Sequence, residues 1–295
     1  MLADGTIGVR ERIATPRFDY AATVEAVGQL VENMDRAAGR ICAVGAGTPG
    51  AVEPATGLMK NCNSTWLNGQ PLLADLVRRV GDRVRIANDA NCFALSESSD
   101  GAGADERILF GVILGPGVGG GIVVEGRLLQ GRNGIAGEWG HTPLPYLRSD
   151  VDELELHLAD RRCYCGRVNC VETFLSGPGL AMTHAALWGE TRLPREIAKA
   201  ADVNSARTLE LYSRQLARAL AQIINIIDPD VIVLGGGVSE VGSLYRRVSA
   251  LWREYVFSDK VATVLRPAQH GATSGVRGAA WLWPADYTLN SIQAK

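Results

Sequence analysis

The fold class follows from Asp228-Pro229-Asp230-Val231-Ile232-Val233-Leu234-Gly235-Gly236-Gly237, which joins a long helix to a glycine turn. Apolar residues recur at helical spacing through residues 208–227, so a buried helix is expected before the Asp-Pro-Asp segment. Four consecutive aliphatic residues then indicate a buried strand, and the glycines end it. A helix followed by a short apolar strand and a glycine turn is typical of an α/β protein.

The same alternation is found along the rest of the chain. Further strands are expected at residues 6–14, 41–46, 84–87, 108–114 and 122–124, the last two joined by a glycine-rich turn over 115–121. Further helices are expected at residues 20–37 and 89–97. The pattern predicts an α/β chain with a largely wound sheet, and a length of 295 residues favours two domains.

Composition excludes several classes of function. The chain is 46% hydrophobic and 21% charged, as in soluble globular proteins, and its net charge of −2 gives no basic field for nucleic acid. No apolar run is long enough to span a membrane, and the N-terminal residues do not form a signal peptide. Six cysteines are too few for a disulfide scaffold, so a reducing, cytoplasmic location is expected.

Three of the six cysteines lie within eight positions and form a candidate metal site. Cys163, Cys165 and Cys170, with His141 upstream, supply the ligand set of a closed tetrahedral zinc site. All four positions are filled by protein, so the metal is expected to be structural. The alternative is that three reduced thiols lie close together by chance.

Asp89 is the candidate catalytic base, at the expected boundary between a strand and a helix. A carboxylate at a helix start is more often an N-cap or a first-turn charge. The other residues of the candidate site favour a catalytic role for Asp89, because Asn88, Glu138 and Glu172 offer donors and acceptors for a polyhydroxylated ligand. An unpaired base beside a bound hydroxyl is what phosphoryl transfer requires.

Two glycine loops are candidate nucleotide-binding elements. Each is a weak signal, because glycine after a strand is more often turn geometry than a phosphate cradle. Two such loops in a chain that also carries a candidate base together favour nucleotide binding. The residues concerned are Gly115, Gly117, Gly235, Gly236 and Gly237.

Together these motifs resemble the ROK family of bacterial sugar kinases. The resemblance covers almost the whole chain and rests on Asn88-Asp89-Ala90-Asn91-Cys92, Gly137-Glu138-Trp139-Gly140-His141, the Cys-x-Cys-Gly-x-x-x-Cys-x-Glu segment that starts at Cys163, the Asp228 to Ser239 stretch and Ser274-Gly275-Val276-Arg277-Gly278-Ala279-Ala280. Residues 61–71 and 138–145 most resemble the fructokinase/mannokinase branch.

The resemblance implies a two-domain actin/hexokinase-like (ribonuclease H-like) ATPase fold with the active site in a cleft. The expected division is residues 1–105 plus 275–295 for the small domain and 106–274 for the large domain with the zinc site. It implies ATP, Mg²⁺, structural Zn²⁺ and a homodimer. Asp89 would deprotonate the C6 hydroxyl of a hexose, fructose first, with mannose, glucose or N-acetylglucosamine as alternatives. The implied sugar-binding residues are Asn63, Asn88, Glu138, His141 and Glu172.

The chain departs from the family pattern at several positions. The first phosphate-binding loop, Asp-x-Gly-Gly-Thr-Lys, is not found, Pro116 stands where Thr is usual in the second loop, and Ala272 replaces a common acidic residue. Proline removes a backbone N–H that could meet phosphate. Two explanations are open: a start codon placed too far downstream, or a catalytically impaired member that binds sugar without ATP.

Overall fold

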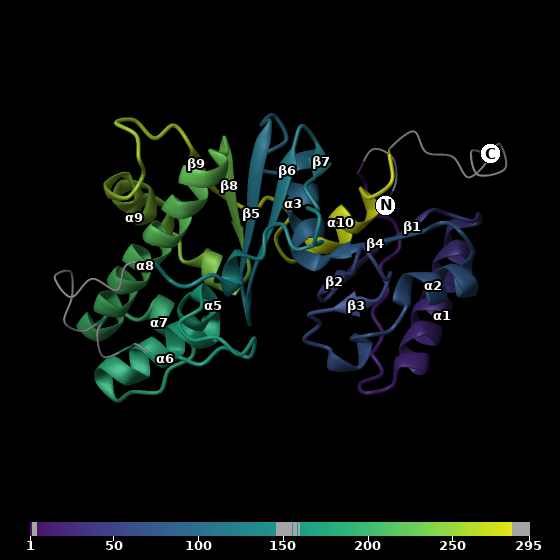
Figure 1. Cartoon of the computed structure of the whole chain (residues 1–295), viewed down its shortest axis with the longest axis horizontal. Helices are drawn as coiled ribbons and strands as arrows, with labels where there is room; N and C mark the ends of the chain where they lie inside the picture. Colours follow the sequence, from purple (N-terminus) through teal and green to yellow (C-terminus); the bar gives the residue numbers. More distant parts are fainter. Residues whose placement is uncertain (2–4, 146–154, 156–157, 159, 285–295) are drawn as a thin grey trace.

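A five-stranded sheet in the order β7-β6-β5-β8-β9 is the centre of the larger lobe of this computed structural model (Figure 1). The structure describes residues 1, 5–145, 155, 158 and 160–284. β5 pairs antiparallel with β6 and parallel with β8, which is parallel to β9. The strands span Ile108–Leu114 (β5), Val118–Val124 (β6), Arg127–Leu128 (β7), Val231–Gly235 (β8) and Val264–Pro267 (β9).

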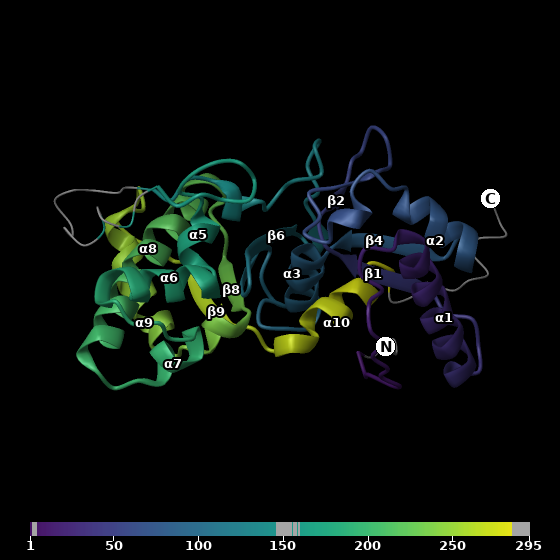
Figure 2. The ribbon, with the colours of Figure 1, turned by 90° about the horizontal axis from the view of Figure 1, so that it is seen from below.

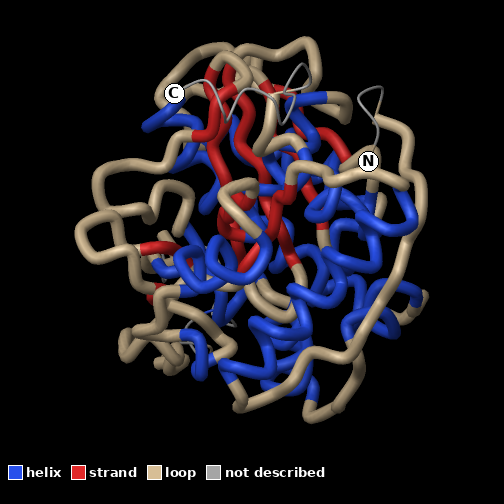
Figure 3. The backbone as a smooth tube through the Cα atoms, turned by 90° about the vertical axis from the view of Figure 1, so that its right-hand side faces the viewer, coloured by secondary structure: helices blue, strands red, loops and turns tan. Residues whose placement is uncertain are grey.

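Both faces of this sheet are buried, which explains its continuous apolar strands. Along β8, Val231 and Val233 face one way and pack with Phe93 of α3 (Asp89–Ser99). Ile232 and Leu234 face the other way, into the core formed with α8 (Val203–Ile227). Figure 3 shows the strands gathered in the middle of the molecule with helices around them.

Shorter helices complete the larger lobe around α8, which shares an apolar core with one face of the sheet. They are α5 (Val171–Leu175), α6 (Gly177–Trp188), α7 (Pro194–Lys199) and α9 (Ser243–Leu251). Short 3-10 turns lie at η2 (Trp139–His141), η3 (Gly237–Glu240), η4 (Trp252–Glu254) and η5 (Gly271–Thr273).

The smaller lobe is built on a parallel pair of strands, β1 (Val44–Thr48) and β4 (Val84–Asn88). Helices α1 (Tyr20–Ala38) and α2 (Leu72–Val80) pack with them around a separate core that contains Met59, Leu72 and Leu76. The same lobe holds the antiparallel pair β2 (Ala51–Val52) and β3 (Met59–Lys60) and the turn η1 (Thr65–Leu67).

Two helices, α3 and α10 (Ser274–Ala280), lie between the two lobes (Figure 2). They cross very closely, since a Cβ added at Gly278 of α10 would lie 1.5 Å from the carbonyl oxygen of Cys92 in α3. On its other side α10 meets β1, where a Cβ at Gly45 would lie 1.7 Å from the carbonyl oxygen of Ala279. Close backbone approach at Gly278 therefore sets the position of α3 relative to the smaller lobe.

The elements agree with the sequence-based expectations at most positions and differ at four, one of which is the strand expected at residues 41–46, found at Val44–Thr48. The expected strand over residues 6–14 is wrong: this segment is largely exposed and pairs with no described strand. The glycine turn is shorter than expected, because residues 118–121 belong to β6 and pair with β5. The helix expected from residue 208 begins at Val203. The division of the chain at residues 105, 106, 274 and 275 stays a prediction.

None of the helices in the described parts of the chain is long and apolar enough to cross a lipid bilayer.

Replacing Gly278 by alanine should destabilise the protein, because the new methyl group cannot fit without moving α3 or α10. We expect a loss of about 1–3 kcal/mol in the free energy of unfolding. Gly275 of the same helix is the matched control, since a Cβ there meets nothing within 4 Å. Gly275→Ala should be neutral or stabilising by up to about 1 kcal/mol. Urea unfolding of both variants tests this, and equal midpoints would contradict it.

Candidate functional site

Asp89 is the first residue of α3, directly after β4 ends at Asn88. Asn88 caps the helix: its Oδ1 accepts hydrogen bonds from the N–H groups of Ala90 (2.8 Å) and Asn91 (3.3 Å). Its Nδ2 donates to the carbonyl of Gly50 (3.0 Å). The capping role is therefore taken by Asn88, and Asp89 accepts one hydrogen bond, from the Ala90 N–H (2.8 Å).

Burial raises the pKa of Asp89, an effect partly opposed by the backbone hydrogen bond from Ala90. Among the described residues no cation forms an ion pair with it. A carboxylate that is desolvated and lacks a counter-charge is a stronger base than an exposed one. This is the state expected of a group that accepts a proton from a substrate.

Two further carboxylates lie near Asp89. Burial raises the pKa of Glu138; the imidazole of His141 lowers it, and the charges of Asp89 and Glu172 raise it again. These groups are therefore close enough to interact electrostatically. Glu172, in the first turn of α5, is held in place because its Oε2 accepts the Val118 N–H at the start of β6 (2.9 Å). The structure thus places Asp89, His141 and Glu172 within electrostatic range of Glu138, and the catalytic and sugar-binding roles of these residues stay predictions.

The fifth expected sugar-binding position does not join this cluster through any described contact. Asn63 is exposed on the loop after β3, in the smaller lobe. Asn88 lies beside Asp89, although its amide is already engaged as the helix cap and with Gly50. Sugar-binding roles for these two residues stay predictions.

The side chains of His141, Cys163, Cys165 and Cys170 converge, and their ligand atoms all lie within 4.8 Å of one another. His141 Nδ1 is 3.5 Å from Cys163 Sγ, and Cys165 Sγ is 3.6 Å from Cys170 Sγ. Zn–S distances of about 2.3 Å place tetrahedral ligands roughly 3.8 Å apart, so both the spacing and the donor set suit zinc.

Backbone pairing around this cluster fixes the two acidic segments to each other. Cys170 forms a β-bridge with Pro143, and the Val171 N–H donates to the Thr142 carbonyl (2.9 Å). The segment that follows Glu138 and the segment that precedes Glu172 therefore run side by side. Ligands of one metal ion at His141 and Cys170 would lock them in this register.

The two glycine loops are neighbours at the carboxyl ends of two inner strands of the main sheet. β5 and β8 are parallel neighbours, so the turns that follow them, at Gly115 and Gly236, lie side by side. A Cβ at Gly236, whose φ is +87°, would lie 2.4 Å from the carbonyl oxygen of Leu114. Ligands of α/β proteins bind outside the carboxyl ends of parallel strands, which makes these two turns a candidate nucleotide site. Nucleotide contacts of Gly115, Gly117, Gly235, Gly236 and Gly237 stay predictions.

Sequence reasoning missed two residues that the structure places in important positions. Glu97, later in α3, is fully buried and accepts four hydrogen bonds from segments next to α3 and α10. Tyr164 has its hydroxyl 3.0 Å from Nε2 of His141. A signal was available for Tyr164, because it stands between two of the candidate metal-ligand cysteines. For Glu97 no local pattern separates it from a surface charge on a helix.

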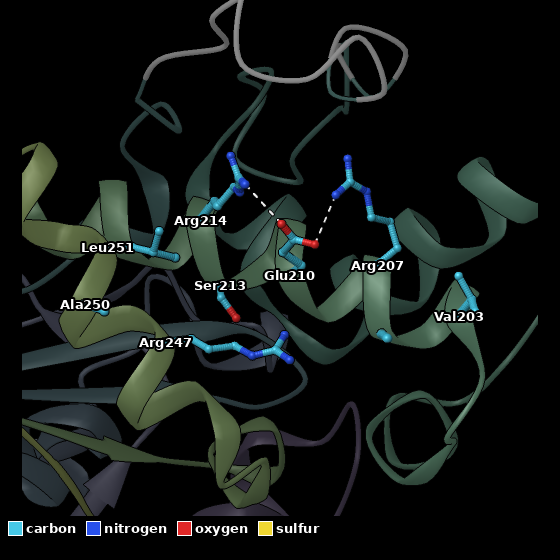
Figure 4. A pocket seen from close by; sticks show the side chains of 9 residues that line it. Val203, Arg207, Glu210, Ser213, Arg214, Arg247, Ala250 and Leu251 are labelled. Atoms are coloured by element: carbon cyan, nitrogen blue, oxygen red, sulfur yellow. Dashed lines mark hydrogen bonds and ion pairs between the residues drawn. The ribbon is translucent and has the colours of Figure 1, made fainter.

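A separate groove of about 550 Å³ lies between α8 and α9 and is not part of this site. Glu210 at its rim accepts from both Arg207 and Arg214, as Figure 4 shows. Its lining comes from two helices of the larger lobe and includes none of the clustered carboxylates or cysteines.

The fold and the site define a two-domain protein of the actin/hexokinase-like class. The family model described as "ROK family" matches residues 1–286, and the chain belongs to this family. It is 38% identical over 282 residues to the N-acetyl-D-glucosamine kinase of Salmonella newport (strain SL254), covering 94% of this chain and 91% of that one.

Solved structures give the same result. The ROK hexokinase from Thermus thermophilus superposes with a TM-score of 0.77 at 27% identity, covering 96% of this chain and 91% of that one. The ROK family glucokinase from Streptomyces griseus, solved with glucose and AMPPNP, superposes with a TM-score of 0.73 at 27% identity, covering 95% and 92%. The assignment to the fructokinase/mannokinase branch stays a prediction.

Asp89→Asn should leave the protein at least as stable as the wild type at pH 7. Burial raises the folded-state pKa of Asp89, so the ionised carboxylate is destabilising above that pKa and the penalty disappears as the pH falls through it. The unfolded chain ionises Asp at about 3.9. The stability difference between variant and wild type should therefore shrink toward pH 4. Thermal unfolding from pH 4 to pH 8 measures this, and a variant less stable at pH 7 would contradict it.

Proposed function

We propose that this sugar kinase transfers the γ-phosphoryl group of ATP to the C6 hydroxyl of a hexose. The observation that carries the proposal is Asp89: a desolvated carboxylate at the start of α3, near Glu138 and Glu172, with no ion-pair partner among the residues that the structure describes. The similarity to the N-acetyl-D-glucosamine kinase and to the glucose-bound glucokinase supports a sugar as the acceptor.

In the proposed reaction Asp89 accepts the proton of the C6 hydroxyl while the hydroxyl oxygen forms a bond to the γ-phosphorus of ATP. The bond between the γ-phosphorus and the β,γ-bridging oxygen breaks, and ADP leaves. Bound ATP with Mg²⁺ supplies the phosphoryl group and neutralises charge on the phosphates. Glu138 and Glu172 accept hydrogen bonds from sugar hydroxyls, and the glycine turns after β5 and β8 face the phosphates. Positioning of the hydroxyl and the base in this way provides much of the rate enhancement.

Two sugars are the first candidates for the acceptor. Fructose is favoured by the resemblance of residues 61–71 and 138–145 to the fructokinase/mannokinase branch. N-Acetylglucosamine is favoured by the 38% identity to kinases that carry its name. Mannose and glucose complete the set. These sugars differ by single hydroxyls, their ring form or one acetamido group, so discrimination depends on individual hydrogen bonds.

Pro116 favours a second candidate function, sugar binding without phosphoryl transfer. It is exposed in the turn between β5 and β6 and has no N–H to offer a phosphate. A protein of this kind would bind a hexose in calorimetry and show no nucleotide binding. Calorimetry with the non-hydrolysable analogue AMPPNP separates the two functions directly.

The proposal includes a structural zinc ion and a homodimer. The zinc rests on the spacing and chemistry of His141, Cys163, Cys165 and Cys170. The homodimer rests on the family resemblance, and light scattering of the purified protein tests it.

A coupled assay that follows ADP production tests the kinase function, with fructose, N-acetylglucosamine, mannose and glucose as acceptors. Asp89→Asn should lower kcat by roughly 10²–10⁴-fold, because the general base is lost. Asp259→Asn, in an exposed loop, is the matched control and should keep the wild-type rate. A wild-type rate in the Asp89→Asn variant would overturn the proposed role.

Metal analysis tests the zinc site. Protein purified without chelators should contain one zinc ion per chain, and Cys170→Ser should lose it and unfold at a lower temperature. Cys42→Ser removes a half-buried thiol outside the cluster and should retain the metal. Metal-free protein with all thiols reduced would argue for the chance arrangement of cysteines.

A further inference from the structure

Tyr164 lies between Cys163 and Cys165, on a tight turn of the cysteine cluster. The Cys163 N–H donates to the Arg167 carbonyl (2.8 Å), and the Gly166 N–H donates to the Cys163 carbonyl (3.0 Å). Both neighbours of Tyr164 carry their thiols into the cluster. The backbone of Tyr164 is therefore held in place by this turn.

The Tyr164 side chain meets the far side of the His141 ring. Its hydroxyl is 3.0 Å from Nε2 of His141, and the two rings stand edge to face with centroids 5.1 Å apart. The other ring nitrogen, Nδ1, faces Cys163 Sγ. With a metal on Nδ1, Nε2 carries the proton and donates, so the tyrosine oxygen accepts.

The family resemblance gives His141 a role in sugar binding, and this hydrogen bond occupies one of its two ring nitrogens. The four-ligand cluster occupies Nδ1, which leaves Nε2 as the only ring nitrogen that can meet a substrate. The phenol oxygen thus lies where a sugar hydroxyl would be expected.

Little else holds the ring in this position. Tyr164 is 71% exposed, and its other described side-chain contact is the edge-to-face packing on His141. Rotation about the side-chain bonds would release Nε2 without moving the backbone. A group held by one hydrogen bond can be displaced by a ligand that offers an equivalent bond.

We propose that Tyr164 is a specificity-determining residue that occupies Nε2 of His141 when no sugar is bound and is displaced by a hexose hydroxyl. This inference rests on the proposed function of the same site. The apparent affinity for sugar is then reduced by the fraction of molecules in which Nε2 is occupied. A sugar must present a hydroxyl to Nε2 to recover the lost hydrogen bond, so a deoxy analogue at that carbon is selected against.

The test is Tyr164→Phe in the zinc-loaded full chain, which keeps the ring and removes only the hydroxyl. The calorimetric Kd and the KM for the preferred hexose should fall roughly two- to tenfold, the range of one net hydrogen bond, while kcat stays the same. Zinc content and thermal midpoint establish that the variant is folded. Tyr20→Phe is the matched control, since its hydroxyl binds Asp75 in the smaller lobe, and Kd should not change.

The outcomes separate this inference from the proposed function. An unchanged Kd in an active enzyme overturns the inference alone. A raised Kd also overturns it, because the phenol then contacts the bound sugar instead of being displaced by it. A lowered Kd in a protein that binds hexose without turnover supports the inference and overturns the kinase function. Absence of binding to any of the four hexoses, in wild type and variant, overturns both.

Discussion

The buried carboxylate of Glu97 in α3 binds the segment that leads into α10, and so joins the two helices that lie between the lobes. It is 0% exposed and accepts hydrogen bonds from the N–H groups of Ala102, Gln269 and His270 and from the hydroxyl of Ser274. Burying a carboxylate is unfavourable unless its oxygens are fully hydrogen-bonded, and four donors meet that requirement here. Because Glu97 and Asp89 both belong to α3, these hydrogen bonds also fix the position of Asp89 relative to the sheet and to the glycine turns that follow β5 and β8.

Two separate structural elements, helix α3 and the cysteine cluster, position different residues of the site. Helix α3, held by Glu97 and by the close contact at Gly278, places Asp89. The cysteine cluster places Glu138 and Glu172, because the segments that carry them are paired through Cys170 and Val171. Damage to the cluster should therefore affect recognition of the ligand first, whereas damage to α3 should affect proton transfer first.

Local patterns predicted much of the fold and part of the site. The apolar run of β8, the helix α8 and the strand–helix boundary at Asp89 could be predicted because neighbouring residues in sequence determine them. The segment at residues 6–14 has strand-like alternation, but a strand also needs a pairing partner, which alternation does not specify. Glu97 could not be recognised, since three of its four donors lie more than 170 positions away. Tyr164 is exposed, and only the fold of the cysteine turn brings it to His141.

The convergence of Asp89, Glu138 and Glu172 is itself an argument about the ligand. Burial raises the pKa of Glu138, and the like charges of Asp89 and Glu172 add to the rise. No described cation offsets the charge of Asp89. A neutral ligand rich in hydroxyl donors relieves this repulsion by hydrogen bonding to the charged oxygens, so its binding is favoured. An anionic ligand adds to the repulsion. For the proposed reaction the same charges therefore favour entry of the neutral hexose and departure of its phosphate ester, and they hold Asp89 ready to accept the proton in between.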